Sequence, residues 1–260
     1  MYTHLELREV FHLEFLRWFG RKVKSEYYAV KGGVNLRFFY KSIRYSEDMD
    51  IDAYGIRKDV LMDMVMQVLG SPSFQTTLKP FGIERVVPPD ISKAKQTETT
   101  QRFKAHLVTY AGEDLFTKIE FSRRGFNGII AVEPVSDDIT RAYKLQPLVA
   151  PHYDIGSAIK QKIGALNART VTQARDIFDL YSLSGQYQRS KEESLLLPPS
   201  KLKEACEKIF DIDFENFRDT VVAYFPDEDR GVYGKPAVWD EIKLKTARFL
   251  EDFGREKENG

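Results

Sequence analysis

The segment Asp48-Met49-Asp50-Ile51-Asp52, in which three aspartates alternate with two large apolar residues, places the strongest constraint on the fold. This period of two predicts a β-strand, because successive side chains of a strand point to opposite faces of its sheet. The three carboxylates would then share one face. Like charges that share one face of a strand at this spacing repel one another. A bound cation would relieve that repulsion, whereas a solvated strand face usually avoids it by mixing charge signs.

A pair of glycines precedes this strand, in the run Lys31-Gly32-Gly33-Val34. One interpretation is a plain tight turn. The other is a turn that opens a short helix and presents backbone N–H groups to a phosphate. Mg²⁺ prefers carboxylate oxygens as ligands and often shares them with substrate phosphates. The two segments together therefore indicate nucleotide chemistry.

The composition limits the classes of protein to which the chain can belong. Its 260 residues suffice for one large domain or two modest ones. The 39 basic and 39 acidic residues give a net charge of zero, so no global basic field indicates nucleic-acid binding. The single cysteine excludes an internal disulfide and a Cys-rich zinc site. No apolar run reaches the roughly 20 residues that span a bilayer, and we expect a cytoplasmic protein with no membrane partner.

The hydrophobic pattern of the first part predicts an α+β domain. Residues 1–24 have the spacing of an amphipathic helix, and residues 34–40 and 60–69 are also expected to be helical. Short strands are expected at 27–30 and at Asp48–Ala53. The pattern then changes to a period of two, which predicts successive strands at 81–87, 102–110, 115–122 and 129–135.

Beyond Pro147 and Pro151 the strand signals stop and helical patterns take over. Helices are expected at Ile155–Ala168, 173–183, 201–210, 214–224 and 238–253, with a polar surface connection at 185–193. We therefore divide the chain into an α+β domain, residues 1–150, and a helical domain, residues 151–260.

Further charged residues stand at positions where they could take part in the same chemistry. Glu120 lies on an expected strand two residues after Lys118, and it could supply a third carboxylate to a two-metal site or simply form a solvated Lys–Glu couple. Lys162 and Arg169 are seven residues apart, nearly aligned on one helix face, and could hold a triphosphate. A charged outer face is the alternative interpretation of this pair.

Taken together, these segments resemble a known family. KGGVNLRFFY followed by RYSEDMDID resembles the nucleotidyltransferase motif of the AbiEii/AbiGii toxin family, Lys-Gly-Gly-x-x-Leu-Arg and then Ser-x-Asp-Ile/Leu-Asp. KQKIGALNAR and ARDIFDLY resemble the later motifs of that family. The resemblance extends over residues 25–183, with the motifs in the family's order.

The resemblance implies a DNA polymerase β-type nucleotidyltransferase fold with a mixed sheet, followed by a helical domain that completes the active-site cleft. Members are toxins of bacterial toxin–antitoxin or phage-defence pairs, and some add nucleotides to the 3′ end of tRNA. It therefore implies an NTP donor, Mg²⁺ in a one- or two-metal site, an RNA acceptor such as tRNA, and a cognate antitoxin encoded by an adjacent gene.

The resemblance also implies roles for particular residues. Asp48 and Asp50 become the metal-binding carboxylates, with Glu120 as the third acid, although the alternation leaves Asp50 with Asp52 as the other possible pair. Ser46, just before Asp48, favours the first pair. The catalytic set implied is Asp48, Asp50, Lys162 and Asp176, and the nucleotide-binding set is Gly32, Gly33, Arg37, Ser46, Arg169 and Asp179. Two features depart from the general superfamily pattern, a longer interval before the aspartates and Glu in place of Asp as the third acid.

Three other functions stay open at this point. The chain could transfer a nucleotide to a small molecule or a protein side chain. It could bind nucleotides as a regulator without turnover. It could also be an interaction protein whose acidic strand docks a basic partner.

Overall fold

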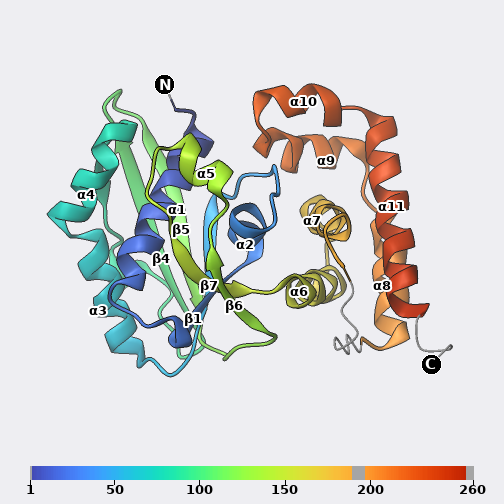
Figure 1. The fold of residues 1–260 in the computed structure, drawn as a ribbon, viewed down its shortest axis with the longest axis horizontal. Coiled ribbons are helices and arrows are strands. Elements are labelled where there is room, and N and C mark those ends of the chain that lie inside the picture. The colour runs from blue at the N-terminus through green and yellow to red at the C-terminus, as the bar shows by residue number, and fades with distance from the viewer. Residues whose placement is uncertain (1, 189–196, 256–260) are drawn as a thin grey trace. The chain divides into compact units, whose positions relative to one another are not determined.

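A computed structural model describes residues 2–188 and 197–255 of the chain (Figure 1). These residues divide into two compact units, which we describe separately. The first comprises Met1–Lys41 and Tyr45–Tyr153, and the second comprises Ser42–Arg44 and Asp154–Gly260. The chain therefore enters the second unit for three residues before the aspartate strand begins. Most of the polar connection expected at 185–193 lies outside the described residues.

The first unit contains a seven-stranded sheet and five α-helices in its described part. In chain order its elements are α1 (His4–Gly20), β1 (Tyr28–Lys31), α2 (Gly32–Phe39), β2 (Asp48–Ala53), α3 (Lys58–Leu69), α4 (Pro72–Leu78), β3 (Ile83–Val87), β4 (Thr100–Thr109), β5 (Asp114–Ser122), β6 (Ile130–Pro134), α5 (Asp137–Ala142) and β7 (Val149–Tyr153). Short 3₁₀ turns at Ser25–Tyr27, Lys79–Phe81 and Ile91–Lys93 complete the unit.

The sheet is mixed, with the strand order β3-β4-β5-β2-β1-β7-β6. β2 lies near its centre, antiparallel to β1 and parallel to β5. The register places Asp48 opposite Lys118, and it places Asp50 opposite both Glu120 and Lys31. Strands that are far apart in the sequence thus bring the expected third acid next to the aspartates.

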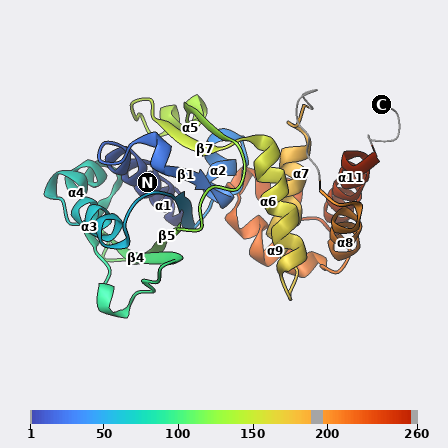
Figure 2. The ribbon, with the colours of Figure 1, turned by 90° about the horizontal axis from the view of Figure 1, so that it is seen from below.

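One face of this sheet is covered by helices, because its strands present a continuous apolar surface. Met49 and Ile51 of β2 are fully buried in the same core as Ile119 and Phe121 of β5. Helix α1 supplies much of the covering layer together with α3 and α4, which lie on the same side of the sheet (Figures 1 and 2). The aspartates of β2 alternate with Met49 and Ile51 and therefore belong to the opposite face.

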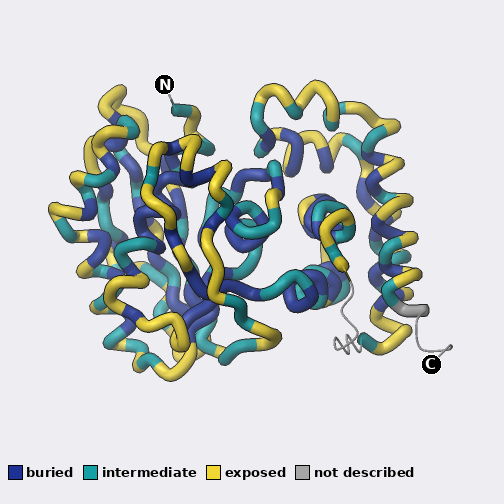
Figure 3. The backbone as a smooth tube through the Cα atoms, viewed as in Figure 1, coloured by how far each residue is buried: buried dark blue, intermediate teal, exposed yellow. Residues whose placement is uncertain are grey.

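All the regular secondary structure of the second unit, within its described part, is helical. Its helices are α6 (Ile155–Ala168), α7 (Ala174–Ser184), α8 (Pro199–Ile209), α9 (Phe214–Thr220), α10 (Asp227–Tyr233) and α11 (Pro236–Arg255), with a 3₁₀ turn at Val222–Tyr224. α11 buries Trp239, Ile242 and Leu250 on one side and is exposed on the other (Figure 3). Trp239 stacks on Phe217 with 4.2 Å between ring centroids, which ties α11 to α9.

The α+β class expected from the sequence is confirmed. β2 and α6 have the predicted bounds, and α2 begins at Gly32, two residues earlier than expected. The prediction that strand signals stop around Pro147 and Pro151 was wrong, because β7 spans Val149–Tyr153 and pairs with β6, with Pro151 opposite Val132. The sequence analysis also missed α4, α5 and α10, each of only six or seven residues. None of the described helices is long and apolar enough to cross a membrane.

Candidate active site

The turn from β1 into α2 has a backbone conformation at position 32 that favours glycine. Gly32 has φ +65°, in the left-handed region that favours glycine. A Cβ at this position would lie 2.9 Å from Oδ2 of Asp50. The backbone at the start of α2 therefore closely approaches the central aspartate. Gly33 follows within the first turn of α2, and Lys31, the N-cap residue, gives no side-chain cap to that turn.

The three aspartates of β2 share one face, as the alternation predicts, but they differ in their partners. Asp52 is buried and fully engaged. Its Oδ1 lies 2.5 Å from Nζ of Lys31, and its Oδ2 accepts a hydrogen bond of 2.6 Å from the hydroxyl of Tyr153. Asp48 is more open, with 39% of its side chain exposed, and it forms an ion pair of 2.9 Å with Lys118.

Asp50, between these two, has no hydrogen bond or ion pair to its carboxylate among the described residues. Burial raises its pKa, and the nearby charges of Glu120 and Asp48 raise it further. Lys31 and Lys118 act in the opposite direction without cancelling the rise. The Asp50 carboxylate is thus held in a charged cluster that does not neutralise it.

Glu120 stands opposite Asp50 as the sequence predicts, but its carboxylate already has a partner. Its Oε2 lies 2.5 Å from Nε of Arg102 on β4 and 4.0 Å from Nζ of Lys118. Accordingly, no group of three or more His, Cys, Asp or Glu side chains in the described ranges is arranged to hold a metal ion. Asp48 and Asp50 retain oxygens that could serve as ligands, and Glu120 retains its Oε1.

This donor set fits Mg²⁺, which is commonly bound by one or two protein carboxylates together with substrate phosphates. Lys118 lies between Asp48 and Glu120 and supplies positive charge there. The raised pKa of Asp50 marks the point at which further positive charge would be favourable.

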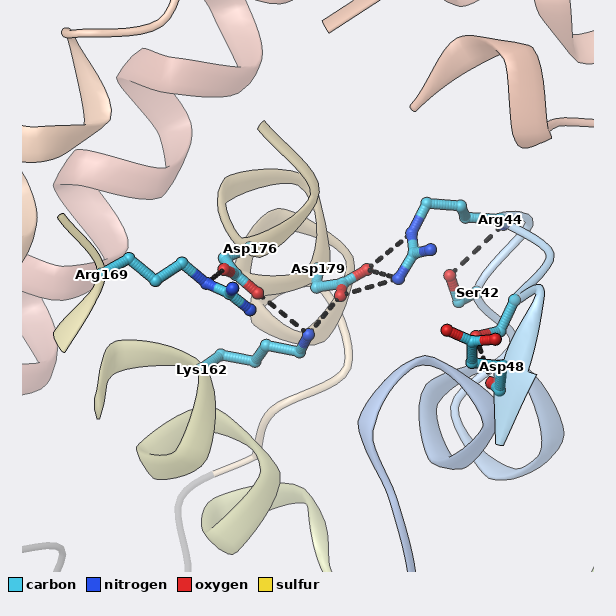
Figure 4. Close-up of polar contacts among 8 residues, drawn as sticks. Ser42, Arg44, Asp48, Lys162, Arg169, Asp176 and Asp179 are labelled. Carbon is cyan, nitrogen blue, oxygen red and sulfur yellow. Dashed lines mark hydrogen bonds and ion pairs between the residues drawn. The ribbon is translucent and has the colours of Figure 1, made fainter. Parts of the chain in front are cut away.

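A second charged cluster is buried in the helical unit (Figure 4). Nζ of Lys162 on α6 lies 3.2 Å from Oδ1 of Asp176 and 2.6 Å from Oδ2 of Asp179, both on α7. Arg169, just after α6, contacts Asp176 at 2.7 Å. Arg44 binds Asp179 with its Nε at 3.1 Å and its terminal nitrogen at 2.9 Å. All four residues that the sequence placed in this half come together, and Arg44 is added to them.

The charges in this cluster stabilise one another. Burial alone would raise the pKa of Asp179, but Arg44 and Lys162 outweigh it and hold that pKa below its usual value. Burial would lower the pKa of Lys162, but Asp179 and Asp176 hold it above its usual value. Among the described residues, three cations face two carboxylates in this cluster, an excess of one positive charge.

Two residues of the expected nucleotide-binding set have other partners. Arg37 donates from its Nε to Glu9 at 2.6 Å, and its guanidinium lies 4.2 Å from the centre of the Tyr45 ring, so it links α2 to α1. Ser46 donates a hydrogen bond of 2.8 Å to the backbone carbonyl of Asp48 and orders the chain where β2 begins.

Sequence reasoning missed three cations that shape these clusters: Lys31, Arg44 and Arg102. The registers of β1 with β2 and of β4 with β5 place Lys31 opposite Asp50 and Arg102 opposite Glu120. Arg102 lies on the strand predicted at 102–110, and Lys31 directly follows the strand predicted at 27–30, so a register prediction could have found both. No sequence signal links Arg44 to Asp179.

Comparison with known proteins connects this geometry to one family. The family model described as "Nucleotidyl transferase AbiEii toxin, Type IV TA system" matches residues 15–258. Among solved structures, the chain is similar to MenT4, a nucleotidyltransferase toxin from Mycobacterium tuberculosis, with 18% identity, a TM-score of 0.61, and 96% of this chain and 84% of that one covered. It is also similar to JHP933 from Helicobacter pylori, with 18% identity, a TM-score of 0.55, and 96% and 92% covered. No curated protein matches the sequence.

Proposed function

This chain belongs to the AbiEii family of nucleotidyltransferase toxins of type IV toxin–antitoxin systems, and we propose that it transfers a nucleotide from an NTP to an RNA acceptor with the help of Mg²⁺. The 3′ end of tRNA is the acceptor that the family resemblance favours. The observation that carries the proposal is the un-neutralised Asp50 carboxylate, which lies between Asp48 and Glu120 and against the Gly32 turn.

Asp48 and Asp50 are the metal-binding pair in this proposal. Asp52 is left out of it because both of its oxygens are already bound, one to Lys31 and the other to Tyr153. Glu120 acts as the third acid through its charge beside Asp50 while its Oε2 stays with Arg102. The assignment therefore favours Asp48 over Asp52, a choice that the alternating sequence leaves open.

Different residues of the first unit bind the metal and the phosphate in this proposal. When bound, Mg²⁺ supplies positive charge that activates the attacking hydroxyl and stabilises the leaving pyrophosphate. Asp48 and Asp50 hold it, and the free backbone N–H groups at the start of α2 bind a phosphate of the NTP. Such a reaction needs alignment and charge neutralisation more than covalent help from the protein.

In the helical unit, Lys162 and Arg169 bind the triphosphate, and Asp176 with Asp179 hold those two cations in place. The excess positive charge of the cluster supports a role in binding an anion. Arg169 is the more accessible cation, with 33% of its side chain exposed compared with 12% for Lys162. We therefore assign phosphate contact chiefly to Arg169 and charge balance to Lys162.

The central experiment measures nucleotide transfer with each of the four labelled NTPs, with and without bulk tRNA, at several Mg²⁺ concentrations. Asp48→Asn and Asp50→Asn should abolish transfer without loss of fold. Asp52→Asn should instead lower the melting temperature and leave measurable transfer. Full transfer by Asp50→Asn would refute the assignment. Transfer that needs no tRNA would point to a small-molecule or protein acceptor, and NTP binding without transfer would point to a regulator.

The helical cluster offers a matched pair of lysines on one helix. Lys162 forms two buried ion pairs, whereas Lys160, also on α6, forms none among the described residues. The two positions are about 200° apart around the helix. Lys162→Met should weaken NTP binding or slow transfer much more than Lys160→Met. Equal effects would mean that the contribution is general surface charge.

The biological role can be tested by expression in a bacterial host. Growth arrest that requires Asp50, and that co-expression of the neighbouring gene relieves, would support a toxin whose antitoxin is encoded next to it. Sequencing of tRNA 3′ ends before and after induction identifies the acceptor. Normal growth at high expression with unchanged tRNA ends would count against the proposed acceptor and role.

A further inference from the structure

A histidine is buried inside helix α1, where the other buried positions are mostly apolar. His12 is only 1% exposed, and it lies on the side of α1 that faces the sheet. Burial lowers its pKa to about 3, and the charge of Arg8 adds to the effect, so the imidazole is neutral at physiological pH. It can therefore take part in a directed hydrogen bond with one nitrogen protonated.

The partner of His12 is Thr117 on β5, which is also fully buried. Nε2 of His12 lies 2.9 Å from Oγ1 of Thr117, and that hydroxyl donates a hydrogen bond of 2.7 Å to the backbone carbonyl of Glu47. A threonine hydroxyl has a single proton. Because this proton goes to Glu47, the hydroxyl must accept from His12, and the imidazole proton must be on Nε2.

This chain of hydrogen bonds ends one residue before the metal-binding aspartates. The pairing of β2 with β5 begins with Asp48 opposite Lys118, so Glu47 is the last residue before the ladder. The Thr117 hydroxyl holds the chain at that point, where the β2–β5 ladder does not reach. Ser46 also donates a hydrogen bond to the carbonyl of Asp48.

We propose that Thr117, oriented by His12, is a positioning residue that fixes the Asp48 carboxylate for metal binding. The inference rests on the proposed function, since it takes Asp48 as a metal ligand. Neither side chain touches substrate or metal. Both act through the carbonyl of Glu47, which sets the direction in which β2 starts. Partners that orient metal ligands in this way typically change metal affinity by about 10–100-fold when removed.

The test uses the full-length protein and two readouts, Mn²⁺ binding and hydrogen exchange of the backbone around residue 48. Thr117→Val keeps the shape of the side chain and removes the hydroxyl, whereas Thr117→Ser keeps the hydroxyl. Thr109→Val is the matched control, because Thr109 is a buried threonine at the far end of β4, where it bonds within the hairpin to Glu113.

We expect Thr117→Val to weaken Mn²⁺ binding about tenfold and to speed exchange around residue 48, with Thr117→Ser close to wild type. His12→Leu should act in the same direction with a smaller effect, because Thr117 can still donate to Glu47. Wild-type Mn²⁺ affinity and exchange in Thr117→Val, or equal changes in Thr109→Val, would overturn the inference.

The failure of the proposed function gives a different pattern. If the wild-type protein binds no Mn²⁺ and Asp48→Asn changes nothing, the metal assignment fails. Hydrogen exchange then still decides whether Thr117 fixes the start of β2, because that readout needs no metal.

Discussion

Replacement of Gly32 by alanine should reduce activity much more than it reduces stability. The position has φ +65°, where an alanine costs about 1–2 kcal/mol. The new Cβ would lie 2.9 Å from Oδ2 of Asp50, although the Cβ and Cγ of Asp50 are at ordinary distances of 3.5 and 3.6 Å. Only the end of the aspartate side chain must therefore move, and little stability should be lost beyond the backbone cost.

The functional loss should be larger. To restore a normal contact of about 3.5 Å, Oδ2 must shift by roughly 0.6 Å. A misplacement of about 1 Å near the reacting groups can cost about 100-fold in rate, so roughly tenfold is expected here. Gly112 provides the control, because it has φ +80° in the β4–β5 hairpin and nothing lies within 4 Å of the place that an added Cβ would take.

The assay compares Gly32→Ala with Gly112→Ala. Urea unfolding should give both variants a similar loss of about 1–2 kcal/mol. Mn²⁺ titration and transfer rates should then show a roughly tenfold defect in Gly32→Ala and none in Gly112→Ala. If both variants keep wild-type Mn²⁺ affinity and transfer, the close approach of Gly32 to Asp50 has no functional role and the reasoning fails.

Three further predictions concern the two charged clusters. Because the pKa of Asp50 is raised in the folded protein, the charge of its carboxylate lowers stability at neutral pH. Asp50→Asn should therefore have a higher melting temperature than wild type at pH 7. The difference should shrink as pH falls through that raised pKa. Lys118→Met should remove charge that Lys118 supplies near Asp48, so Mn²⁺ should raise the melting temperature of this variant more than that of wild type. Asp179→Asn should lower the free energy of unfolding by about 3–5 kcal/mol at pH 7, because it leaves buried cations uncompensated. This loss shrinks in acid, as wild-type Asp179 is protonated. Asp219→Asn, in an exposed pair with Arg218, should change urea unfolding little.

The strand of aspartates was predictable because its information is local. A period of two in residues 48–52 determines which side chains share a face, and fully buried Met49 and Ile51 confirm it. What the sequence could not tell is which aspartates are free to bind a ligand. Asp52 is occupied by Tyr153, which is 101 residues away, and a contact at that separation leaves no periodic signal.

The errors of the sequence analysis have the same origin. Strand signals were expected to stop after Pro147 and Pro151, and proline cannot donate to a ladder. In the sheet, however, β7 is held by its pairing with β6, so tertiary pairing overrides the local preference. In the helical half, the choice between a charged outer face and a buried cluster depended on Arg44, which binds Asp179 from 135 residues away.

The two clusters, each taken within its own unit, have net charges of opposite sign. In the first unit, Asp48, Asp50, Asp52 and Glu120 face the three cations Lys31, Arg102 and Lys118, which leaves one negative charge at the un-neutralised Asp50. In the second unit, three cations face two carboxylates and leave one positive charge. The first cluster therefore gains from a bound cation and the second from a bound anion. Among the described residues, neither cluster reaches charge balance with its own side chains, and the two imbalances have opposite signs.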